Sequence, residues 1–379
     1  MTQRIDFRVV EDFAALSAQE RLVWDAIAAE QSPFTPFLPV FWHETWWRAF
    51  RDVSASVDRR LLIYVMRRDG EIVGFFPMFR QTNTRFGLKL FRHIKPLGAD
   101  GNLTELRTGI VRAGLERDAY AALADYFRDT ERQWDAITLP SPPPEAGDVY
   151  DAFPEHPTVP VKEGFVLPLA ATWEAFRSGL KRNIKESIRK CTNSVKRDGI
   201  ELKFSCLSEP DAIRAVLPQF YQLHNMRAAQ EAGNQHKDYF QRDAARHFLD
   251  ALISGAAQSG VRLFTLKDGE RLVAARLGFE NESCTYLYYS GYDLDYGKYS
   301  VPTQLVIDVV KRAIASGQQF VHLSFGRDVS KTRWGPREMG FACRLMFQNS
   351  VRGVLAAQMV AHRRRRAAGE SAVQEPKDD

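Results

Sequence analysis

Cysteine is scarce in this chain of 379 residues. The four cysteines, Cys191, Cys206, Cys284 and Cys343, form no C-x-x-C pair and have no metal-ligand spacing. This pattern argues against a disulfide framework, a redox pair and a structural zinc site. We therefore expect a reduced, cytoplasmic protein that holds no metal.

Long apolar runs are also missing. No stretch approaches the ~20 residues that cross a bilayer, and residues 1–13 mix charges without the apolar core of a signal peptide. The charge balance is mild, with 52 Lys and Arg residues against 47 Asp and Glu residues, a net charge of +5. This excess is too small to predict a DNA-binding protein, although it suits an anionic ligand.

Several catalytic signatures are absent as well. The sequence has no Walker loop, no G-x-G-x-x-G after a strand, no H-E-x-x-H and no G-x-S-x-G. P-loop, dinucleotide-binding, zinc-protease and nucleophile-elbow chemistry therefore lack their usual sequence support.

The sequence does contain one order of elements twice: a hairpin, a further strand, a helix and an apolar strand. The predicted segments are strands 61–66 and 72–79, helix 115–131 and strand 135–139 in the first half, and strands 261–266 and 271–279, helix 302–316 and strand 320–325 in the second. Each hairpin is predicted from an Asp-Gly turn between β-rich runs. The repeated order favours an internal duplication.

A proline-rich segment, residues 140–160, separates the two halves. Repeated proline suppresses both helices and sheet ladders, which is typical of a linker. We expect an α+β fold of mixed α/β sheets, with domains at 1–155 and 156–350. Residues 362–379 are expected to form a flexible charged tail.

Residues 285–335 are the most informative stretch, because they predict a strand, a loop, a capped helix and a second parallel strand. The helix is expected to begin after Ser300, with unpaired N–H groups on Val301, Thr303 and Gln304 that suit a phosphate. The candidate anion site comprises Gly297, Lys298, Tyr299, Ser300, Val301, Thr303 and Gln304. An ordinary capped helix without a ligand is the alternative.

The strand at 320–325 alternates in polarity. Its pattern places Val321, Leu323 and Phe325 on one face, and His322 and Ser324 on the other. A buried histidine of this kind is more often a core residue than a catalyst.

Two polar clusters are candidates for substrate contact and proton transfer. Arg327 and Lys331, just after the strand, could hold an anionic acceptor, and Asp328 between them could act as a base. His224 and Arg227 share one face of a predicted helix and could supply a base and an anion-binding group. An ordinary surface turn and a structural pair are the alternatives.

Residues 173–199 predict one basic amphipathic helix. A solvated helix face is the simplest interpretation. The same cations could guide an anionic substrate or contact acidic lipid, and peripheral membrane contact could also involve Arg363–Arg366.

These elements resemble the GNAT acyltransferase superfamily, and more narrowly the GNAT-type acetyltransferases associated with cellulose and exopolysaccharide biosynthesis. The stretches that carry the resemblance are FLPVFWHETWWRAF at 37–50, FRSGLKRNIKESIRK at 176–190, YDLDYGKYS at 292–300 and FGRDVSKTRWG at 325–335. The resemblance implies two tandem GNAT-like acyl-CoA N-acyltransferase domains, with the active site in the second and a degenerate first copy.

The resemblance also implies where the substrates bind. Acyl-CoA would lie between strands 285–289 and 320–325, with its pyrophosphate at Gly297–Gln304 and Tyr289 at the substrate. The sequence departs from the family pattern at Leu294, where the family has Gln or Arg, and at Tyr299, where it has a small residue.

The predicted activity is acyl transfer, expected to be acetyl transfer, from acyl-CoA to an amine or hydroxyl of a polysaccharide or its precursor. One alternative resembles the Fem-type transferases, which use aminoacyl-tRNA, although no long helical coiled-coil arm is evident. Another is a catalytically inactive double-GNAT scaffold for polysaccharide synthesis.

Overall fold

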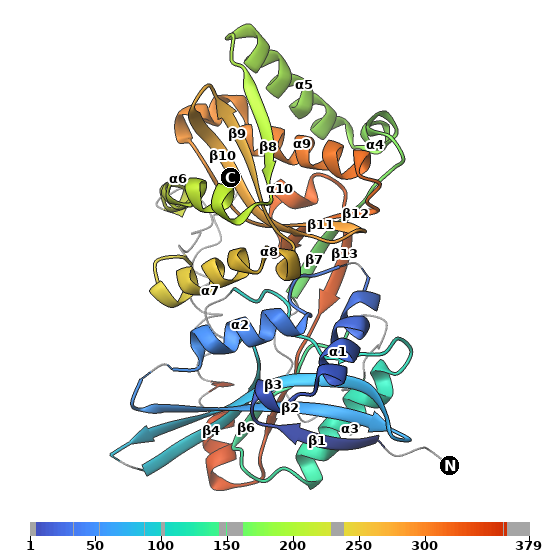
Figure 1. Cartoon of the computed structure of the whole chain (residues 1–379), viewed down its shortest axis with the longest axis vertical. Coiled ribbons are helices and arrows are strands. Elements are labelled where there is room, and N and C mark those ends of the chain that lie inside the picture. The colour runs from blue at the N-terminus through green and yellow to red at the C-terminus, as the bar shows by residue number, and fades with distance from the viewer. Residues whose placement is uncertain are drawn as a thin grey trace, which may run out of the picture.

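The structure is a computed structural model that describes residues 5–32, 34–52, 54–86, 88–99, 103–143, 149, 162–228, 239–358 and 360–361. Two halves, each built on a mixed β-sheet, lie one above the other along the long axis of the molecule (Figure 1). Most of the predicted linker at 140–160 and the whole predicted tail at 362–379 lie outside the described residues.

The first sheet has the order β1-β2-β3-β4-β6-β14, with β5 paired to β3. Its half comprises β1 (Ile5–Val10), α1 (Ala18–Glu30), α2 (Val40–Phe50), β2 (Val57–Arg68), β3 (Glu71–Arg85), β4 (Leu88–Pro96), β5 (Ile110–Val111), α3 (Glu116–Asp129) and β6 (Ala136–Thr138). The chain returns to this sheet near its end, because β14 (Leu345–Phe347) pairs with β6.

The second sheet has the order β13-β7-β12-β11-β10-β9-β8. Its strands are β7 (Lys162–Pro168), β8 (Leu202–Leu207), β9 (Val261–Asp268), β10 (Arg271–Glu280), β11 (Cys284–Tyr292), β12 (Phe320–Phe325) and β13 (Arg337–Phe341). Its helices are α4 (Trp173–Gly179), α5 (Arg182–Arg197), α6 (Pro210–Ala228), α7 (Asp243–Ser254), α8 (Ala256–Ser259), the 3-10 helix η3 (Leu294–Tyr299), α9 (Val301–Ala315) and α10 (Val329–Thr332).

Both predicted hairpins are confirmed, as β2–β3 and β9–β10. Asp69 and Gly70 both have positive φ, at 53° and 85°, as a tight two-residue hairpin turn requires. The single helix predicted over 173–199 is wrong. It is two helices, α4 and α5, because the chain becomes extended at Leu180 and Lys181.

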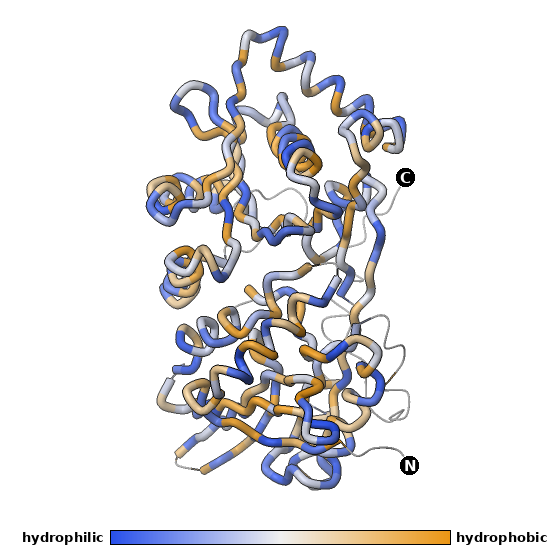
Figure 2. Tube along the Cα trace, turned by 45° about the vertical axis from the view of Figure 1, so that its right-hand side comes forward, coloured by the Kyte–Doolittle hydropathy of each residue, from blue (hydrophilic) through white to orange (hydrophobic). Residues whose placement is uncertain are grey.

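Helices cover both faces of the second sheet. Side chains of α4, α5 and α9 pack with Leu287 of β11 and Val321 of β12 in one hydrophobic cluster. Side chains of α6 and α7 pack with Tyr286 and Tyr288, on the opposite face of β11, in another. Figure 2 shows hydrophobic stretches along the inner strands of both halves.

The second of these clusters continues into the first half, so the halves share a core. The Trp42 ring of α2 lies 5.0 Å from Phe248 of α7 and 5.5 Å from Phe279 of β10. Trp46, one helical turn later, is fully buried and packs on Phe50. The aromatic side chains of α2 therefore serve the packing of this shared core.

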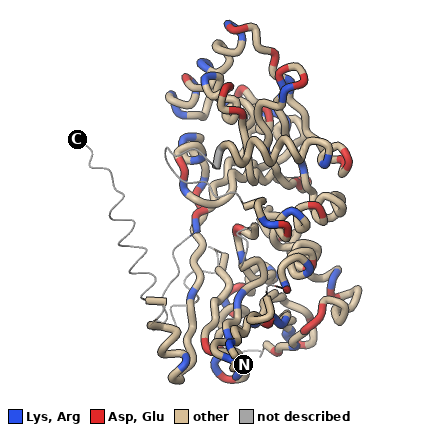
Figure 3. Tube along the Cα trace, turned by 90° about the vertical axis from the view of Figure 1, so that its left-hand side faces the viewer, with Lys and Arg blue, Asp and Glu red and all other residues tan. Residues whose placement is uncertain are grey.

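Charged residues of both signs are interspersed over both halves (Figure 3). No helix among the described residues is long and apolar enough to cross a membrane.

Candidate active site

The parallel strands β11 and β12 separate at the centre of the second sheet. They pair only at Cys284–Phe320, Thr285–Val321 and Tyr286–His322. Beyond Tyr286, β11 stays paired with β10 but has no partner in β12. β12 therefore leaves this part of the β11 edge unpaired, in the stretch where the family resemblance implies that the acyl group binds.

A β-bulge lies on the same part of β11. Between the pairs Arg276–Ser290 and Gly278–Leu287, Tyr288 and Tyr289 stand opposite a single residue of β10. A bulge of this kind re-aims side chains and increases the local bend of a strand. The two adjacent tyrosine rings lie 4.2 Å apart in consequence.

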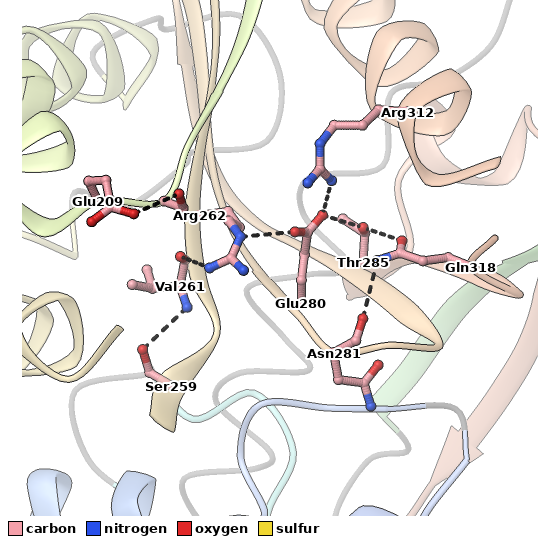
Figure 4. A network of polar contacts seen from close by, with 10 residues as sticks. Glu209, Ser259, Val261, Arg262, Glu280, Asn281, Thr285, Arg312 and Gln318 are labelled. Carbon is pink, nitrogen blue, oxygen red and sulfur yellow. Dashed lines mark hydrogen bonds and ion pairs between the residues drawn. The ribbon is translucent and has the colours of Figure 1, made fainter. Parts of the chain in front are cut away.

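A buried polar network fixes the closed end of this arrangement (Figure 4). The Glu280 carboxylate accepts hydrogen bonds from Arg262 of β9 and Thr285 of β11, at 3.0 and 2.8 Å, and from Arg312 in the last turn of α9. The Thr285 hydroxyl also contacts Gln318, just before β12, at 2.6 Å. These contacts tie β9, β10, β11 and α9 together where β11 and β12 still pair.

The first turn of α9 differs from the sequence prediction. Ser300 adopts the left-handed conformation with φ of 51°, and its side chain makes no capping hydrogen bond. Its carbonyl accepts the N–H groups of Thr303 and Gln304 at 2.8 and 3.1 Å. The prediction that these two groups are unpaired is therefore wrong, because the helix starts with a tight turn that closes on this carbonyl.

Lys298 and Tyr299 are tied to the end of α5. The Tyr299 hydroxyl donates to the Asp198 carboxylate at 2.9 Å, and the Lys298 ammonium lies 3.3 Å from the same group. Hydrogen bonds from Arg197, Tyr299 and Lys298 hold the pKa of Asp198 well below its usual range. The bulky Tyr299, which departs from the family pattern, thus attaches the loop before α9 to α5.

Arg333 is a site residue that the sequence analysis missed. Its guanidinium donates a hydrogen bond to the Thr303 hydroxyl in the first turn of α9. Its Nε is buried without a hydrogen-bond partner, and it makes no ion pair with any described residue. Burial lowers its pKa from the usual value. A half-buried cation at the positive end of a helix is unfavourable by itself and favours a bound anion.

The end of β12 is bent, and this changes which face Phe325 occupies. Ser324 has a φ of 68°, and the pairing with β7 shifts register between His322 and Phe325. The Phe325 ring therefore lies 5.3 Å from the ring of His322. The prediction that Phe325 shares a face with Val321 and Leu323 is wrong for this reason.

The charged groups after β12 are engaged within the protein. Arg327 forms ion pairs with Glu163 at 2.8 Å and Glu338 at 2.5 Å. Lys331 donates to three oxygens at the end of β12, at 2.5 to 3.0 Å. The Asp328 carboxylate caps α10 with a bond of 2.6 Å to a backbone N–H. Their predicted roles toward a substrate remain predictions.

His224 lies on α6 and packs against β11. Its Nδ1 is 3.0 Å from the Ser290 carbonyl oxygen, and its ring is 5.6 Å from that of Tyr289. Two of the predicted site residues, His224 and Tyr289, thus come together beside the bulge. Arg227 lies on the same helix, but its side chain is outside the described part of the structure.

Glu105, from the first half, is a second residue that the sequence analysis missed. Its carboxylate accepts a hydrogen bond from the hydroxyl of Tyr286, the last residue of β11 that pairs with β12. Burial raises the pKa of Glu105, although the Tyr286 hydroxyl opposes the shift. No local sequence signal marks this residue.

Two small cavities adjoin Glu105 and His322 at the junction of the halves. One, of about 40 Å³, is lined by Glu105, Arg107, Lys162 and Cys343 among others. Lys162 donates to the backbone oxygen of Glu105 at 3.1 Å, and burial lowers its pKa to about 8. The second cavity, of the same volume, is lined by His322.

His322 is a core residue, as predicted. Its ring is buried and lies 4.5 Å from that of Tyr286. Burial, with the nearby Lys331 charge, lowers its pKa to about 3, so the imidazole is neutral at physiological pH. The structure offers no cluster of metal-ligating side chains among the residues it describes.

The comparisons with known proteins agree with this geometry. Residues 182–334 match the family model described as Acetyltransferase (GNAT) domain. FemX has a TM-score of 0.57 at 12% identity, over 85% of this chain and 95% of its own. The C-terminal domain of a putative lysylphosphatidylglycerol synthetase from Agrobacterium fabrum has a TM-score of 0.51 at 11% identity, over 90% and 95%. No curated protein matches the sequence.

A third solved structure, a conserved protein of unknown function from Bacteroides thetaiotaomicron, has a TM-score of 0.50 at 10% identity, over 90% of this chain and all of that one. At these identities the likeness concerns the fold. The second half of the chain carries a GNAT domain, and the predicted α+β fold with two GNAT-like domains on mixed sheets is confirmed.

Proposed function

We propose that this protein is an acyl-CoA-dependent acyltransferase that acetylates an amine or hydroxyl of a polysaccharide or its precursor. The observation that carries the proposal is the separation of β11 from β12 beyond Tyr286, combined with a half-buried cation at the start of α9, Arg333, that forms no ion pair with a described residue. The first feature offers an open backbone edge to an acyl group, and the second offers a charge to an anionic donor.

The donor would lie across the start of α9. The Val301 N–H at the start of α9 and the Arg333 side chain would hold the pyrophosphate, since a guanidinium binds phosphate with charge-assisted hydrogen bonds. The acyl arm would follow the open edge of β11, where a backbone N–H can hydrogen-bond the thioester carbonyl and stabilise negative charge on its oxygen.

The acceptor would attack from the junction of the two halves. Its nitrogen or oxygen forms a bond to the thioester carbon, its proton passes to a base, and the carbon–sulfur bond breaks to release the coenzyme thiolate, which then takes up a proton. Glu105 fits the role of base, since burial raises its pKa and makes it a stronger proton acceptor than a surface carboxylate. His224 and Asp328 stay as the other candidates.

The remaining predicted contacts concern the acceptor. Arg227, Tyr289, Arg327 and Lys331 are proposed to position it. Support differs among them: Tyr289 lies on the bulged part of β11, whereas Arg327 already pairs with two carboxylates and would have to exchange a partner to bind substrate.

Calorimetric titration with acetyl-CoA and longer acyl-CoAs tests the donor. We expect binding by the wild type and an affinity about 10-fold or more lower in Arg333→Gln, since a hydrogen bond to a charged group contributes about 1.5–3 kcal/mol. Arg337→Gln, which removes an exposed cation from the neighbouring β13, is the matched control and should bind as the wild type does. No binding of any acyl-CoA by the wild type would refute the proposal.

One observation favours a second donor, aminoacyl-tRNA. Helix α5 exposes Arg189 and Lys190, and its end contacts the loop before α9 through the Asp198–Lys298 ion pair. A polyanion on this helix would thus lie beside the donor site. Salt-sensitive tRNA binding together with no acyl-CoA binding would support this alternative. Binding of neither donor would support a scaffold role.

A further inference from the structure

The distal end of the β3–β4 hairpin is a two-stranded ribbon that extends past its sheet (Figure 1, lower left). β2 pairs with β3 only as far as Asn83. On its other edge β4 pairs with β6 only at His93 and Ile94. Arg85 and Leu88, opposite each other near the tip, therefore lack a sheet neighbour on the outer side of either strand within the described structure.

The ribbon exposes a concentration of large apolar side chains. Phe86 is 90% exposed, Leu88 68% and Leu90 49%. Phe86 also has a φ of 51°, an uncommon conformation for a bulky residue. Three exposed apolar side chains within five residues mark a binding surface rather than scattered surface hydrophobics.

Cations accompany these apolar side chains. Arg85 and Lys89 are exposed, and neither forms an ion pair with a described residue. Residues 80–95 contain no Asp or Glu. The base of the ribbon is anchored, because Arg92 pairs with the buried carboxylate of Asp135 at 2.9 Å. The ribbon thus presents an apolar, positively charged tip on a fixed support.

We propose that this tip inserts into the surface of an anionic phospholipid bilayer. Phe86, Leu88 and Leu90 would enter the boundary of the acyl chains, while Arg85 and Lys89 would contact the headgroup phosphates. A second copy of the chain fits less well, since a stable interface buries ~800 Å² per partner, far more than a narrow ribbon tip offers.

The ribbon replaces the basic helix as the place of membrane contact. The apolar side chains of α5, Ile184 and Ile188, are buried against α9, so that helix offers charge without side chains to insert. The proposal goes beyond the acyl-transfer function and does not depend on it.

Sedimentation of the full-length protein with lipid vesicles tests the proposal. We expect binding to vesicles of equal parts phosphatidylglycerol and phosphatidylcholine, and much weaker binding to phosphatidylcholine alone. Phe86→Ser/Leu88→Ser should lower the partition coefficient about 10-fold or more, and Arg85→Gln/Lys89→Gln about 10-fold. Leu22→Ser, which removes an exposed leucine (66%) from α1, is the matched control and should bind as the wild type does.

A single-residue probe reports on insertion independently of affinity. In Phe86→Trp, bound to the mixed vesicles, we expect a blue-shifted tryptophan signal that brominated phospholipid quenches, beyond the change in the wild type. Equal vesicle binding by Phe86→Ser/Leu88→Ser and the wild type would overturn the proposal. So would no binding to anionic vesicles, or concentration-dependent self-association of the wild type that the double variant abolishes.

Discussion

His43, on α2, should make the stability of the protein acid-sensitive. The imidazole is only 4% exposed, and neither ring nitrogen has a hydrogen-bond partner among the described residues. It packs beside the ring of Trp24 at 5.5 Å. Burial without a partner lowers its pKa from 6.5 to about 3.

The direction of the effect follows from which state binds the proton more readily. The unfolded chain protonates His43 near pH 6.5, whereas the folded protein resists protonation until about pH 3. Protonation of His43 therefore does not lower the free energy of unfolding above pH 6.5. It lowers this free energy progressively as the pH falls from 6.5 toward 3. At about pH 5 the loss is about 2 kcal/mol, from ~1.4 kcal/mol per pH unit below the unfolded pKa.

His43→Leu should remove this loss. Between about pH 8 and pH 5 the free energy of unfolding should fall by about 2 kcal/mol less in the variant than in the wild type. Urea unfolding followed by tryptophan fluorescence at both pH values measures the difference. Trp46→Phe removes another unpartnered buried nitrogen from the same helix without a titrating group, so its effect should be equal at both pH values. If the free energy of unfolding fell equally between the two pH values in His43→Leu and in the wild type, the reasoning would be refuted.

Three further predictions concern the site and its support. Glu105→Gln should lower kcat about 100-fold or more while the Kd for acyl-CoA stays unchanged, and loss of both would indicate a structural role instead. His224→Ala or Asp328→Ala should lower kcat/KM if that residue is the base, and an unchanged value eliminates it. Gly291→Ala should lower the free energy of unfolding by about 1–3 kcal/mol, because its new Cβ would lie 2.4 Å from the backbone nitrogen of His224. Gly297→Ala, with nothing within 4 Å, is the control for thermal unfolding.

The parts of the fold that follow from local physics could be predicted from the sequence. Asp69-Gly70 permits the positive φ angles of a tight turn, so the hairpin of β2 and β3 is visible in the sequence. The apolar spacing of α9 and the alternation of β12 indicated these elements to within about one residue. The candidate site lies where β12 and its parallel neighbour β11 separate.

The chemistry of the site depends on contacts that local pattern does not contain. Glu105 meets Tyr286 across 181 positions of sequence, and Lys298 meets Asp198 across 100. The prediction treated Lys298 as a cation facing a ligand, whereas Lys298 pairs with Asp198 and Arg333 is the one that forms no ion pair with a described residue. Which of two nearby cations remains unpaired is decided by tertiary packing, and neither composition nor spacing reveals it.

Hydrogen bonds at the junction couple the two halves of the fold. Tyr286 and Tyr288, on either side of the point where β11 leaves β12, donate hydrogen bonds to the Glu105 carboxylate and the Leu103 carbonyl of the first half. Both tyrosines are buried, so removing either acceptor while the halves stay packed would leave a buried hydroxyl without its partner, at a cost of about 1–3 kcal/mol per group. The first half therefore helps to hold the open edge of β11 in place. These contacts give the first half a structural role at the candidate site of the second.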